Sequence, residues 1–483
     1  MLMHKVTTFL SEISIFFREN DSHKAMYTIM DVIKGLKMTE LSLFGTKSKC
    51  NHVYTLLQVF HTLLMYPCFM IRNPFNFHSS SLSHVLHCQK DVFYRFMSNP
   101  QIDWRKLLYN LNIQLWNKIR VRTDHKEGTT CLIVDDTDYP KAGRRIENIG
   151  RVYSHVHNKC ILGFKALFLA ITDGTSQMIL DFAILGEKGK KGNYGMSDRE
   201  LQQRFTKERD KDSALQERLN EYYQKKTDLM ISMIRRAIRK NIRFRYVLAD
   251  SWFACKDIIR FIRSRHIKCD YLGMIKVGEN GKTKYGFERK DFTAPALIKL
   301  LTQRKQKKYS RKLRCYYITV DVVFADTSVR LFFVRRSKNG AWNGLMTTNT
   351  KLEFFEAYKI YSQRWSLEVI FKEAKGMLGL GKCQANNFAS QIASTSLVAL
   401  QYNILSVVKR FTAYETMGKL FQDITKDSLE LSVTDRIWGA LQEIVIAIAN
   451  LFGLLDEEIY DAIINRSEEL GHICDIYKLK LAS

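Results

Sequence analysis

The spacing of apolar positions divides the chain into a helical first part and a β-containing middle part. Residues 1–120 carry apolar side chains at helical spacing, as in Ala25–Lys37 and Arg105–Trp116. From Thr129 onward, short apolar runs rich in β-branched residues predict strands instead. The predicted order is three strands, a helix, a strand, a helix and a fifth strand, which indicates an α/β fold with a mixed sheet and flanking helices. The five predicted strands are Thr129–Asp135, Gly163–Gly174, Gln177–Leu185, Phe244–Asp250 and Cys269–Val277.

The predicted helices of residues 1–120 are short and are separated by polar turns. This arrangement is typical of a helix-turn-helix-like DNA-binding region, and a plain helical bundle has the same pattern. If the region binds DNA, Lys90, Tyr94 and Arg95 on the amphipathic segment Gln89–Met97 are the exposed candidates. We therefore predict a helical DNA-binding region at 1–120, with the plain bundle as the alternative.

Two charged segments interrupt the α/β pattern. Residues 186–226 are heavily charged and predict an exposed, partly helical insertion. Residues 278–346 are β-rich and basic, with the densest charge in Gln303–Arg314, and predict a second insertion. The predicted core is thereby divided into 121–277 and 347–410, and its second part contains one long helix over Lys351–Met377. Residues 411–483 continue as helices and offer a possible dimer interface.

Composition indicates the kind of partner. The 483 residues are 46% hydrophobic, which excludes a disordered chain, and they carry a net charge of +26. A charge this large indicates a polyanionic partner, usually nucleic acid. The ten cysteines include no CxxC pair, which is typical of a reducing compartment. The uncharged stretch His52–Ile71 contains Gln58, His61 and Pro67 and predicts a buried helix, not a membrane span. We expect a cytoplasmic, nucleoid-associated protein with no membrane partner.

The segment Tyr361–Lys375 places four polar groups on one helical face. Tyr361, Arg364, Glu368 and Lys375 follow steps of 3, 4 and 7 residues, which keep their side chains together at about 100° per residue. A carboxylate in this setting can hold a hard divalent cation, while the cations and the phenol can hold a phosphate. The alternative is a solvated helix face with ordinary ion pairs between neighbouring turns.

Asp136 and Asp250, at the ends of the first and fourth predicted strands, are the candidate partners of Glu368. Three converging carboxylates repel one another unless a cation neutralises them, and Mg²⁺ or Mn²⁺ suits such an oxygen site. Two such ions can promote phosphodiester cleavage. Each strand-end acid also has a structural interpretation, as a helix cap for Asp250 or a turn residue for Asp136. Asp135 and Asp136 would point to opposite faces, and spacing alone does not decide between them.

These residues resemble a known family. The pattern Y-x2-R-x3-E-x6-K matches the signature of bacterial insertion-sequence DDE transposases of the insertion sequence 4 group, whose core is ribonuclease H-like. The D-D-T setting of Asp136, the YVLAD strand end before Asp250 and Trp365 after the arginine are also similar. The resemblance covers roughly residues 129–405. It implies that Asp136, Asp250 and Glu368 are catalytic and bind two Mg²⁺ ions, with Mn²⁺ as a substitute, and that a β-rich insertion interrupts the core.

The resemblance also implies DNA contacts. Tyr361, Arg364 and Lys375 would hold DNA phosphates. Trp342, near the end of the basic insertion, would stack on a flipped base during hairpin formation, or else be a core tryptophan. The other predicted DNA-binding residues are the basic side chains of Lys372, Arg304, Lys305, Lys307 and Lys308.

The predicted function is that of a cut-and-paste DNA transposase. It would bind the terminal inverted repeats of its mobile element, cleave the ends with two divalent metal ions and join the 3′-hydroxyls to target DNA, with a hairpin intermediate as one route. Work on two ends of double-stranded DNA implies a homodimer in the complex. Two alternatives are a catalytically silent DNA-binding transposition inhibitor and a ribonuclease H-like nuclease without strand transfer. Residues 1–120 and 186–226 match no part of the family pattern.

Overall fold

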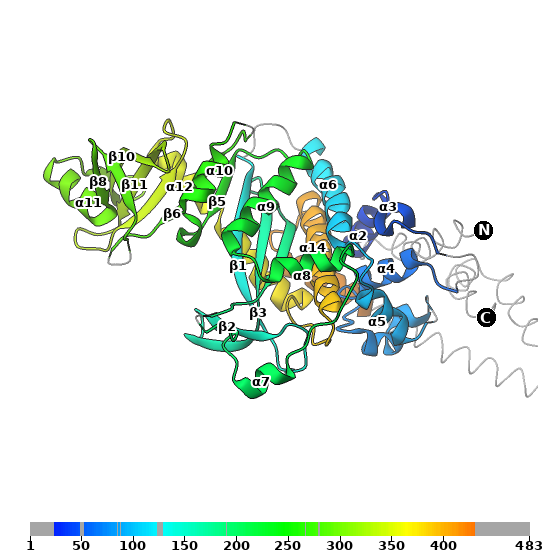
Figure 1. Ribbon diagram of the computed structural model, residues 1–483. Coiled ribbons are helices and arrows are strands. Elements are labelled where there is room, and N and C mark those ends of the chain that lie inside the picture. Colours follow the sequence, from blue (N-terminus) through cyan, green and yellow to red (C-terminus); the bar gives the residue numbers. More distant parts are fainter. Residues whose placement is uncertain are drawn as a thin grey trace, which may run out of the picture. The chain divides into compact units, whose positions relative to one another are not determined.

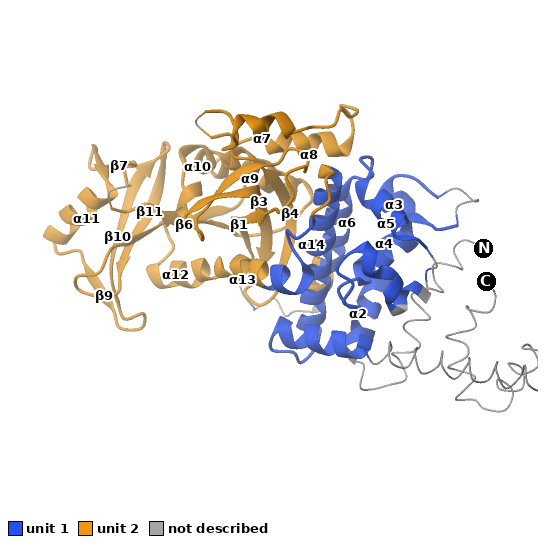
Figure 2. Cartoon of the chain, turned by 90° about the horizontal axis from the view of Figure 1, so that it is seen from below, with its two compact units in different colours: residues 1–115, 373–383, 389–483 blue, residues 116–372, 384–388 orange. Residues whose placement is uncertain are grey.

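The computed structural model describes residues 24–48, 53–84, 86, 88–122, 129–189, 191–265, 267–278 and 281–429 of the chain. The chain forms two compact units, which Figure 2 shows in different colours. Unit 1 comprises Met1–Leu115, Glu373–Cys383 and Ala389–Ser483, and unit 2 comprises Trp116–Lys372 and Gln384–Phe388. Most of the predicted C-terminal dimer interface lies outside the described residues.

Unit 1 is helical in its described residues. Its helix α4 (Leu56–Met65) begins with a capping box, in which Thr55 Oγ1 accepts the Gln58 N–H at 3.1 Å and Gln58 Oε1 accepts the Thr55 N–H at 2.9 Å. Most of α4 is buried, which confirms the helix predicted within His52–Ile71. The other labelled helices that lie wholly or mainly in this unit are α2 (Lys24–Lys34), α3 (Glu40–Phe44), η2 (Pro74–Ser79), η3 (Ser81–His84), α5 (Lys90–Ser98), α6 (Trp104–Arg122), η5 (Ala374–Leu378) and α14 (Phe388–Phe411). A further helical segment covers residues 417–429, where the described residues end.

The helix α14 is the longest of the described helices. It is also the one described helix that is long and apolar enough to cross a membrane, with a mean hydropathy of 1.2, but 94% of that window is buried inside the protein. Burial of this kind is typical of a core helix. Asn403 of α14 donates to Asn112 Oδ1 of α6 at 2.7 Å, so a buried amide pair joins two helices within unit 1.

Unit 2 contains a mixed sheet of twelve strands (Figure 1). The order is β2-β3-β1-β5-β6-β12-β11-β10-β7-β8, while β4 also pairs with β3 and β9 with β10. The strands are β1 (Cys131–Pro140), β2 (Gly150–Ser154), β3 (Lys159–Thr172), β4 (Gln177–Leu185), β5 (Tyr246–Ala249), β6 (Asp270–Ile275), β7 (Lys284–Phe287), β8 (Lys290–Thr293), β9 (Lys308–Ser310), β10 (Cys315–Phe324), β11 (Thr327–Arg335) and β12 (Asn343–Thr347).

The five predicted strands are present as β1, β3, β4, β5 and β6, and the mixed α/β fold with flanking helices is confirmed. The sheet is larger than the five strands predicted, because β12 pairs antiparallel with β6 and carries the strands of the basic segment into the same sheet. Gly344 permits this pairing, since a Cβ there would lie 2.5 Å from Ile275 Cγ1. The free edge of β6 is satisfied in this way by backbone hydrogen bonds.

Helices cover both faces of the sheet in unit 2. The helix α9 buries Leu229, Met233 and Ile234, while Arg236 of α9 donates from Nε to Asp181 Oδ2 of β4 at 2.8 Å. The helices of this unit are α7 (Asp198–Gln203), α8 (Ala214–Tyr222), α9 (Lys226–Arg239), η4 (Ser251–Phe253), α10 (Lys256–Ile262), α11 (Ala294–Gln303), α12 (Phe354–Ser362) and most of α13 (Trp365–Glu373).

The long helix predicted over Lys351–Met377 is interrupted. The Arg364 N–H donates to the Tyr361 carbonyl at 2.9 Å and the Leu367 N–H to the Arg364 carbonyl at 3.2 Å. These bonds span three residues and tighten the chain into a 3₁₀-like turn between α12 and α13, so the prediction of one uninterrupted α-helix is wrong. The four motif residues are distributed over α12 (Tyr361), this turn (Arg364), α13 (Glu368) and the π-helical turn η5 (Lys375).

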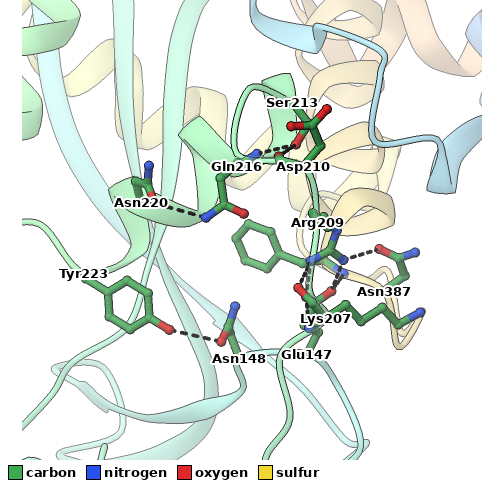
Figure 3. Close-up of polar contacts among 11 residues, drawn as sticks. Glu147, Asn148, Lys207, Arg209, Asp210, Ser213, Gln216, Asn220, Tyr223 and Asn387 are labelled. Carbon is green, nitrogen blue, oxygen red and sulfur yellow. Dashed lines mark hydrogen bonds and ion pairs between the residues drawn. The ribbon is translucent and has the colours of Figure 1, made fainter.

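A buried carboxylate anchors part of the charged segment 186–226. Glu147, between β1 and β2, is fully buried and accepts from Arg209 Nη1 and Nη2 at 2.5 and 2.6 Å (Figure 3). It also accepts the N–H groups of Lys207 and Phe388 at 3.0 and 2.9 Å. Burial alone would raise the pKa of Glu147, but these donors hold it below its usual value. With Tyr222 also buried, the expectation of a wholly exposed insertion is corrected.

Candidate active site

The adjacent acids Asp135 and Asp136 lie on opposite faces of the sheet, because side chains alternate along a strand. Asp135 pairs with Phe168 of β3, and the Phe168 ring lies 5.3 Å from the ring of Phe371 on α13. Cross-strand partners share a face, so Asp135 lies on the face that α13 covers. Asp136 pairs with Leu167 on the other face.

The guanidinium of Arg364 joins Asp135 to Glu368. Its Nη1 lies 2.8 Å from Asp135 Oδ2, and its Nη2 lies 2.6 Å from Glu368 Oε1. The side chain of Arg364 is 16% exposed, that of Asp135 is 19% exposed and that of Glu368 is 34% exposed, so water screens these charges only in part. The structure thus brings two of the predicted helix-face residues together with a strand acid.

Asp250 lies beside Asp135 at the same end of the sheet. Val134 of β1 pairs with Ala249 of the parallel strand β5, so the next residue of each strand, Asp135 or Asp250, lies at the same level. Asp250 also caps η4, because its Oδ1 accepts the Ser251 N–H at 2.5 Å. The capping role considered from the sequence is therefore present, and it uses one oxygen of the carboxylate.

The local charges shift two pKa values in this group. Burial raises the pKa of Asp135 to about 6, Arg364 opposes the rise, and the neighbouring acids Asp136 and Asp250 add to it. Burial also raises the pKa of Tyr361, which Arg364 opposes. Tyr361 Oη is buried and has no hydrogen-bond partner among the described residues, while Arg364 Cζ lies 5.9 Å from its ring centroid. Tyr361 therefore keeps its proton and presents a donor beside the acids.

Asp136 has different partners. Its Oδ2 lies 3.0 Å from Lys226 Nζ of α9 and 3.8 Å from Lys165 Nζ of β3. The Lys165 side chain is only 5% exposed, and its Nζ also pairs with Asp138. The structure therefore groups Asp135, and not the predicted Asp136, with Glu368, because strand alternation turns Asp136 toward these two lysines.

The carboxylates suit a hard cation by their chemistry. Within the described parts of the chain, no three His, Cys, Asp or Glu side chains are close enough together to hold a metal as they stand. Asp135 and Glu368 instead bind the same guanidinium, so one positive charge already offsets part of the negative charge of the pair. Asp135, Asp250 and Glu368 offer only carboxylate oxygens, the donors that Mg²⁺ and Mn²⁺ prefer. The residues therefore fit a divalent cation that takes the place of the guanidinium.

The two lysines predicted on the motif helix lie in different units. Lys372 is exposed near the end of α13 in unit 2. Lys375 is half-buried in η5 of unit 1. Their roles in DNA binding stay predictions.

The predicted DNA contacts of the basic segment are mostly at the surface. Trp342 is half-buried directly before β12, with Arg335 Cζ 4.6 Å from its ring, so it is not a core tryptophan. Arg304 forms a two-pronged ion pair with Glu288, at 2.5 and 2.8 Å. Lys307 Nζ lies 5.2 Å from the Tyr316 ring. Two further predicted residues, Lys305 and Lys308, are exposed.

Sequence reasoning missed Lys165 and Lys226 as partners of Asp136, and Trp252 as an exposed neighbour of Asp250. The lone lysine in the apolar run GFKALFLAI was a usable signal, because a lysine buried in a strand requires an acidic partner. The ion pair of Lys226 and the exposure of Trp252 depend on tertiary structure, and no sequence pattern marks them.

Two family models match the chain. The model of the DDE superfamily endonuclease matches residues 81–269, and that of the transposase DDE domain matches residues 224–404. The two matches support a DDE transposase. The first match includes the strand acids Asp135, Asp136 and Asp250, and the second includes Asp250 and the whole of Tyr361–Lys375. Taken together, the two matches cover the residues that form the candidate site of this nuclease-type enzyme, and Asp250 is the site acid that both include.

Other comparisons add less. No curated protein matches the chain. Among solved structures, the chain is similar to the piggyBac transposase synaptic complex with hairpin DNA, with a TM-score of 0.42 and 9% sequence identity. That similarity covers 89% of this chain and 81% of the other.

Proposed function

We propose that this chain is a transposase of the insertion sequence 4 group with Asp135, Asp250 and Glu368 as its catalytic carboxylates. One observation carries the proposal. Asp135 and Glu368, far apart in the sequence, bind a single guanidinium at 2.8 and 2.6 Å. Asp250 lies beside Asp135 at the end of the neighbouring parallel strand. This assignment replaces Asp136 with Asp135 and keeps the other two predicted acids.

Asp135, Asp250 and Glu368 would together hold two Mg²⁺ ions, with Mn²⁺ as a substitute. When bound, such ions activate the attacking oxygen and stabilise the leaving oxygen in phosphodiester cleavage. The protein contributes a strand acid, a strand-end acid and a helix acid, all on one packed framework, which fixes the carboxylates before DNA arrives. The half-buried setting of Asp135 and Arg364 keeps their charges effective, because little water screens them.

Arg364 and Tyr361 would hold a DNA phosphate beside the acids. A guanidinium is a planar fork of N–H donors, which suits two-pronged binding of a phosphate. The Tyr361 hydroxyl is buried without a partner among the described residues, and it would donate to the same group. Lys375 and Lys372 would add positive charge to the bound strand.

The proposed substrates are the terminal inverted repeats of the mobile element and a target DNA duplex. The net charge of +26 supports a DNA partner. Cleavage of two ends and joining of the 3′-hydroxyls would take place in a homodimer, with a hairpin intermediate as one route if Trp342 stacks on a base. The same proposal includes a ribonuclease H-like core and a nucleoid-associated location in the cytoplasm. It also includes binding of the repeats by residues 1–120 and by the basic segment.

A cleavage and joining assay tests the function. Labelled DNA from the flanks of the coding sequence is incubated with the protein, a target plasmid and Mg²⁺. We expect cleavage at the repeat ends and labelled joined product, and we expect Glu368→Gln to abolish both while DNA binding persists. Cleavage without joined product would indicate a nuclease that does not transfer strands. Binding without cleavage by the wild type would indicate a transposition inhibitor, and full cleavage by Glu368→Gln would refute the site.

A further inference from the structure

Trp252 presents an exposed indole two residues after Asp250. The short helix η4 turns the chain at the end of β5, and it buries Phe253 to 1% exposure while Trp252 stays 59% exposed. A single exposed aromatic ring is common on protein surfaces and does not by itself mark a site. The charged groups around this ring, and its place in the sheet, distinguish it from an ordinary surface side chain.

Two ammonium groups lie against the ring. Lys276 Nζ is 5.2 Å from the centroid of the Trp252 ring, and Lys226 Nζ is 5.7 Å away, both within the range of a cation–π contact. Asp136 Oδ2 lies 3.0 Å from Lys226 Nζ and so fixes this lysine from the strand side. Lys276 is exposed directly after β6. The indole thus has two cations near it, one anchored by Asp136 and one exposed, while the ring itself stays exposed.

The register of the sheet puts this group at the active end. Ala249 of β5 pairs with Gly273 of the parallel strand β6, and Trp252 and Lys276 each follow three residues later. They therefore leave the sheet at the same level, just beyond the strand end that carries Asp250. Ligands of parallel α/β sheets bind beyond the carboxyl ends of the strands, which is where these side chains lie.

We propose that Trp252 and Lys276, with Lys226 as a positioning residue, form a subsite for an unpaired nucleotide of the DNA strand next to the cleaved phosphodiester. The inference rests on the proposed function, which places that phosphodiester at Asp250. The base stacks on the indole and Lys276 contacts the phosphate, the combination by which proteins bind single strands. A paired nucleotide is excluded, because its neighbours in the duplex already cover both faces of its base.

The first test is binding of a short thymidine oligonucleotide that carries one 2-aminopurine, measured on the full-length Glu368→Gln protein by anisotropy and base fluorescence. We expect Trp252→Ala to weaken binding about tenfold, which is the scale of losing one base–aromatic stack. Trp252→Phe retains a ring and keeps the affinity within about threefold. A fully paired duplex of the same length binds Trp252→Ala and its parent nearly equally. The matched control Tyr153→Ala, which removes a 40% exposed ring from β2, leaves both affinities unchanged.

A second test separates the phosphate contact from stacking. We expect Lys276→Gln to weaken single-strand binding several-fold, while the 2-aminopurine stays quenched. The slope of log affinity against log salt concentration should fall in magnitude by about one unit. In terminal-repeat DNA, 2-aminopurine placed at successive positions reports quenching at the nucleotide next to the cleavage site, and Trp252→Ala removes that quenching.

The outcomes distinguish the subsite from the proposed function. Unchanged single-strand affinity in Trp252→Ala, or an equal loss for single strand and duplex, overturns the subsite. An altered oligomeric state of Trp252→Ala in size-exclusion chromatography, with DNA affinity intact, overturns it as well and indicates a protein contact. If stacking depends on Trp252 but the wild type never cleaves repeat ends, the subsite stands as a single-strand site and the proposed function fails.

Discussion

Asp135 and Asp136 are the same chemical group at adjacent positions, and their side chains are equally exposed, at 19%. They differ in their partners. Asp135 shares the Arg364 guanidinium with a second acid, Glu368, whereas Asp136 pairs with Lys226 and Lys165. Exposure therefore does not separate the proposed catalytic acid, Asp135, from its neighbour Asp136. The face of the sheet does, because it decides which counter-charges each acid meets.

The comparison also distinguishes two kinds of counter-ion. Lys165 is 5% exposed and is paired on its own face with Asp136 and Asp138, so it is part of the packed structure. Arg364 is 16% exposed, links acids of two different elements and sits where a divalent cation would neutralise the same charges. If this distinction holds, metal ions should replace the charge of Arg364 and should not replace that of Lys165.

The largest expected effect is on cleavage. Asp135→Asn should lower the cleavage rate of repeat DNA by about a hundredfold to a thousandfold, the scale of removing a group that stabilises charge in the transition state. Asp136→Asn should stay within about tenfold of the wild type, because its carboxylate neutralises lysines and does not meet the substrate. Single-turnover cleavage rates measure both, and thermal melts of the variants provide the folding control. If both variants lost cleavage rate equally, the face of the sheet would not distinguish the two acids.

Lys165→Met should have the largest effect on stability. It removes the buried ammonium group that pairs with both Asp136 and Asp138, so the free energy of unfolding should fall by about 2–4 kcal/mol. Urea unfolding of the metal-free protein measures the loss, and added Mn²⁺ should not restore it. Restoration by Mn²⁺ would mean that the Asp136 face also binds metal.

Arg364→Met should destabilise the metal-free protein by a smaller amount, about 1–3 kcal/mol, because Asp135 and Glu368 then repel each other in a partly exposed site. Here Mn²⁺ should restore the lost stability, since it supplies the missing positive charge. Urea unfolding with chelator and with Mn²⁺ gives both values. The matched control is Arg304→Met, which breaks the exposed two-pronged pair with Glu288 and should barely change stability in either condition. If Mn²⁺ did not restore the stability of Arg364→Met, the guanidinium would not occupy the place of the metal ion.

The smallest expected effect is a dependence of stability on pH. Burial raises the pKa of Asp135 to about 6, above its value of about 3.9 in the unfolded chain. Between these values the folded state holds a proton that the unfolded state has released, so the stability of the metal-free protein falls as pH rises from 4 to 6, by at most about 1.4 kcal/mol per pH unit. Unfolding of the wild type and Asp135→Asn across this range measures the difference. If the free energy of unfolding of the wild type, relative to that of Asp135→Asn, rose with pH, the result would contradict the burial of Asp135.

Most of the residues in this comparison could be located from the sequence, but the sequence could not decide between Asp135 and Asp136. Apolar β-branched runs located β1 and β5, and helical spacing located Arg364 and Glu368 on one side of a helix. The sequence pattern left the choice between Asp135 and Asp136 open, because residues 131–134 are buried on both faces and no alternation of polar and apolar positions marks which face is which. The face on which Asp135 lies is clear only in three dimensions, from its strand pairing with Phe168 and the ring contact between Phe168 and Phe371.

Other features depended on long-range pairing in the same way. The strand β2 is short, with alternating burial, and is not among the five predicted strands. The junction of β6 with β12 joins segments separated by the whole basic region, and Gly344 leaves the room that the Ile275 side chain needs there. The turn at Arg364 contains no proline or glycine, so its sequence resembles an uninterrupted helix.

The most direct measurement is Mn²⁺ binding by full-length wild type, Asp135→Asn and Asp136→Asn, followed by the electron paramagnetic resonance signal of free Mn²⁺. It requires neither cleavage nor knowledge of the repeat sequence. We predict that Asp135→Asn weakens Mn²⁺ binding about tenfold or more, as loss of a ligand should, while Asp136→Asn binds as the wild type does. Weakened binding in Asp136→Asn with normal binding in Asp135→Asn would contradict the account.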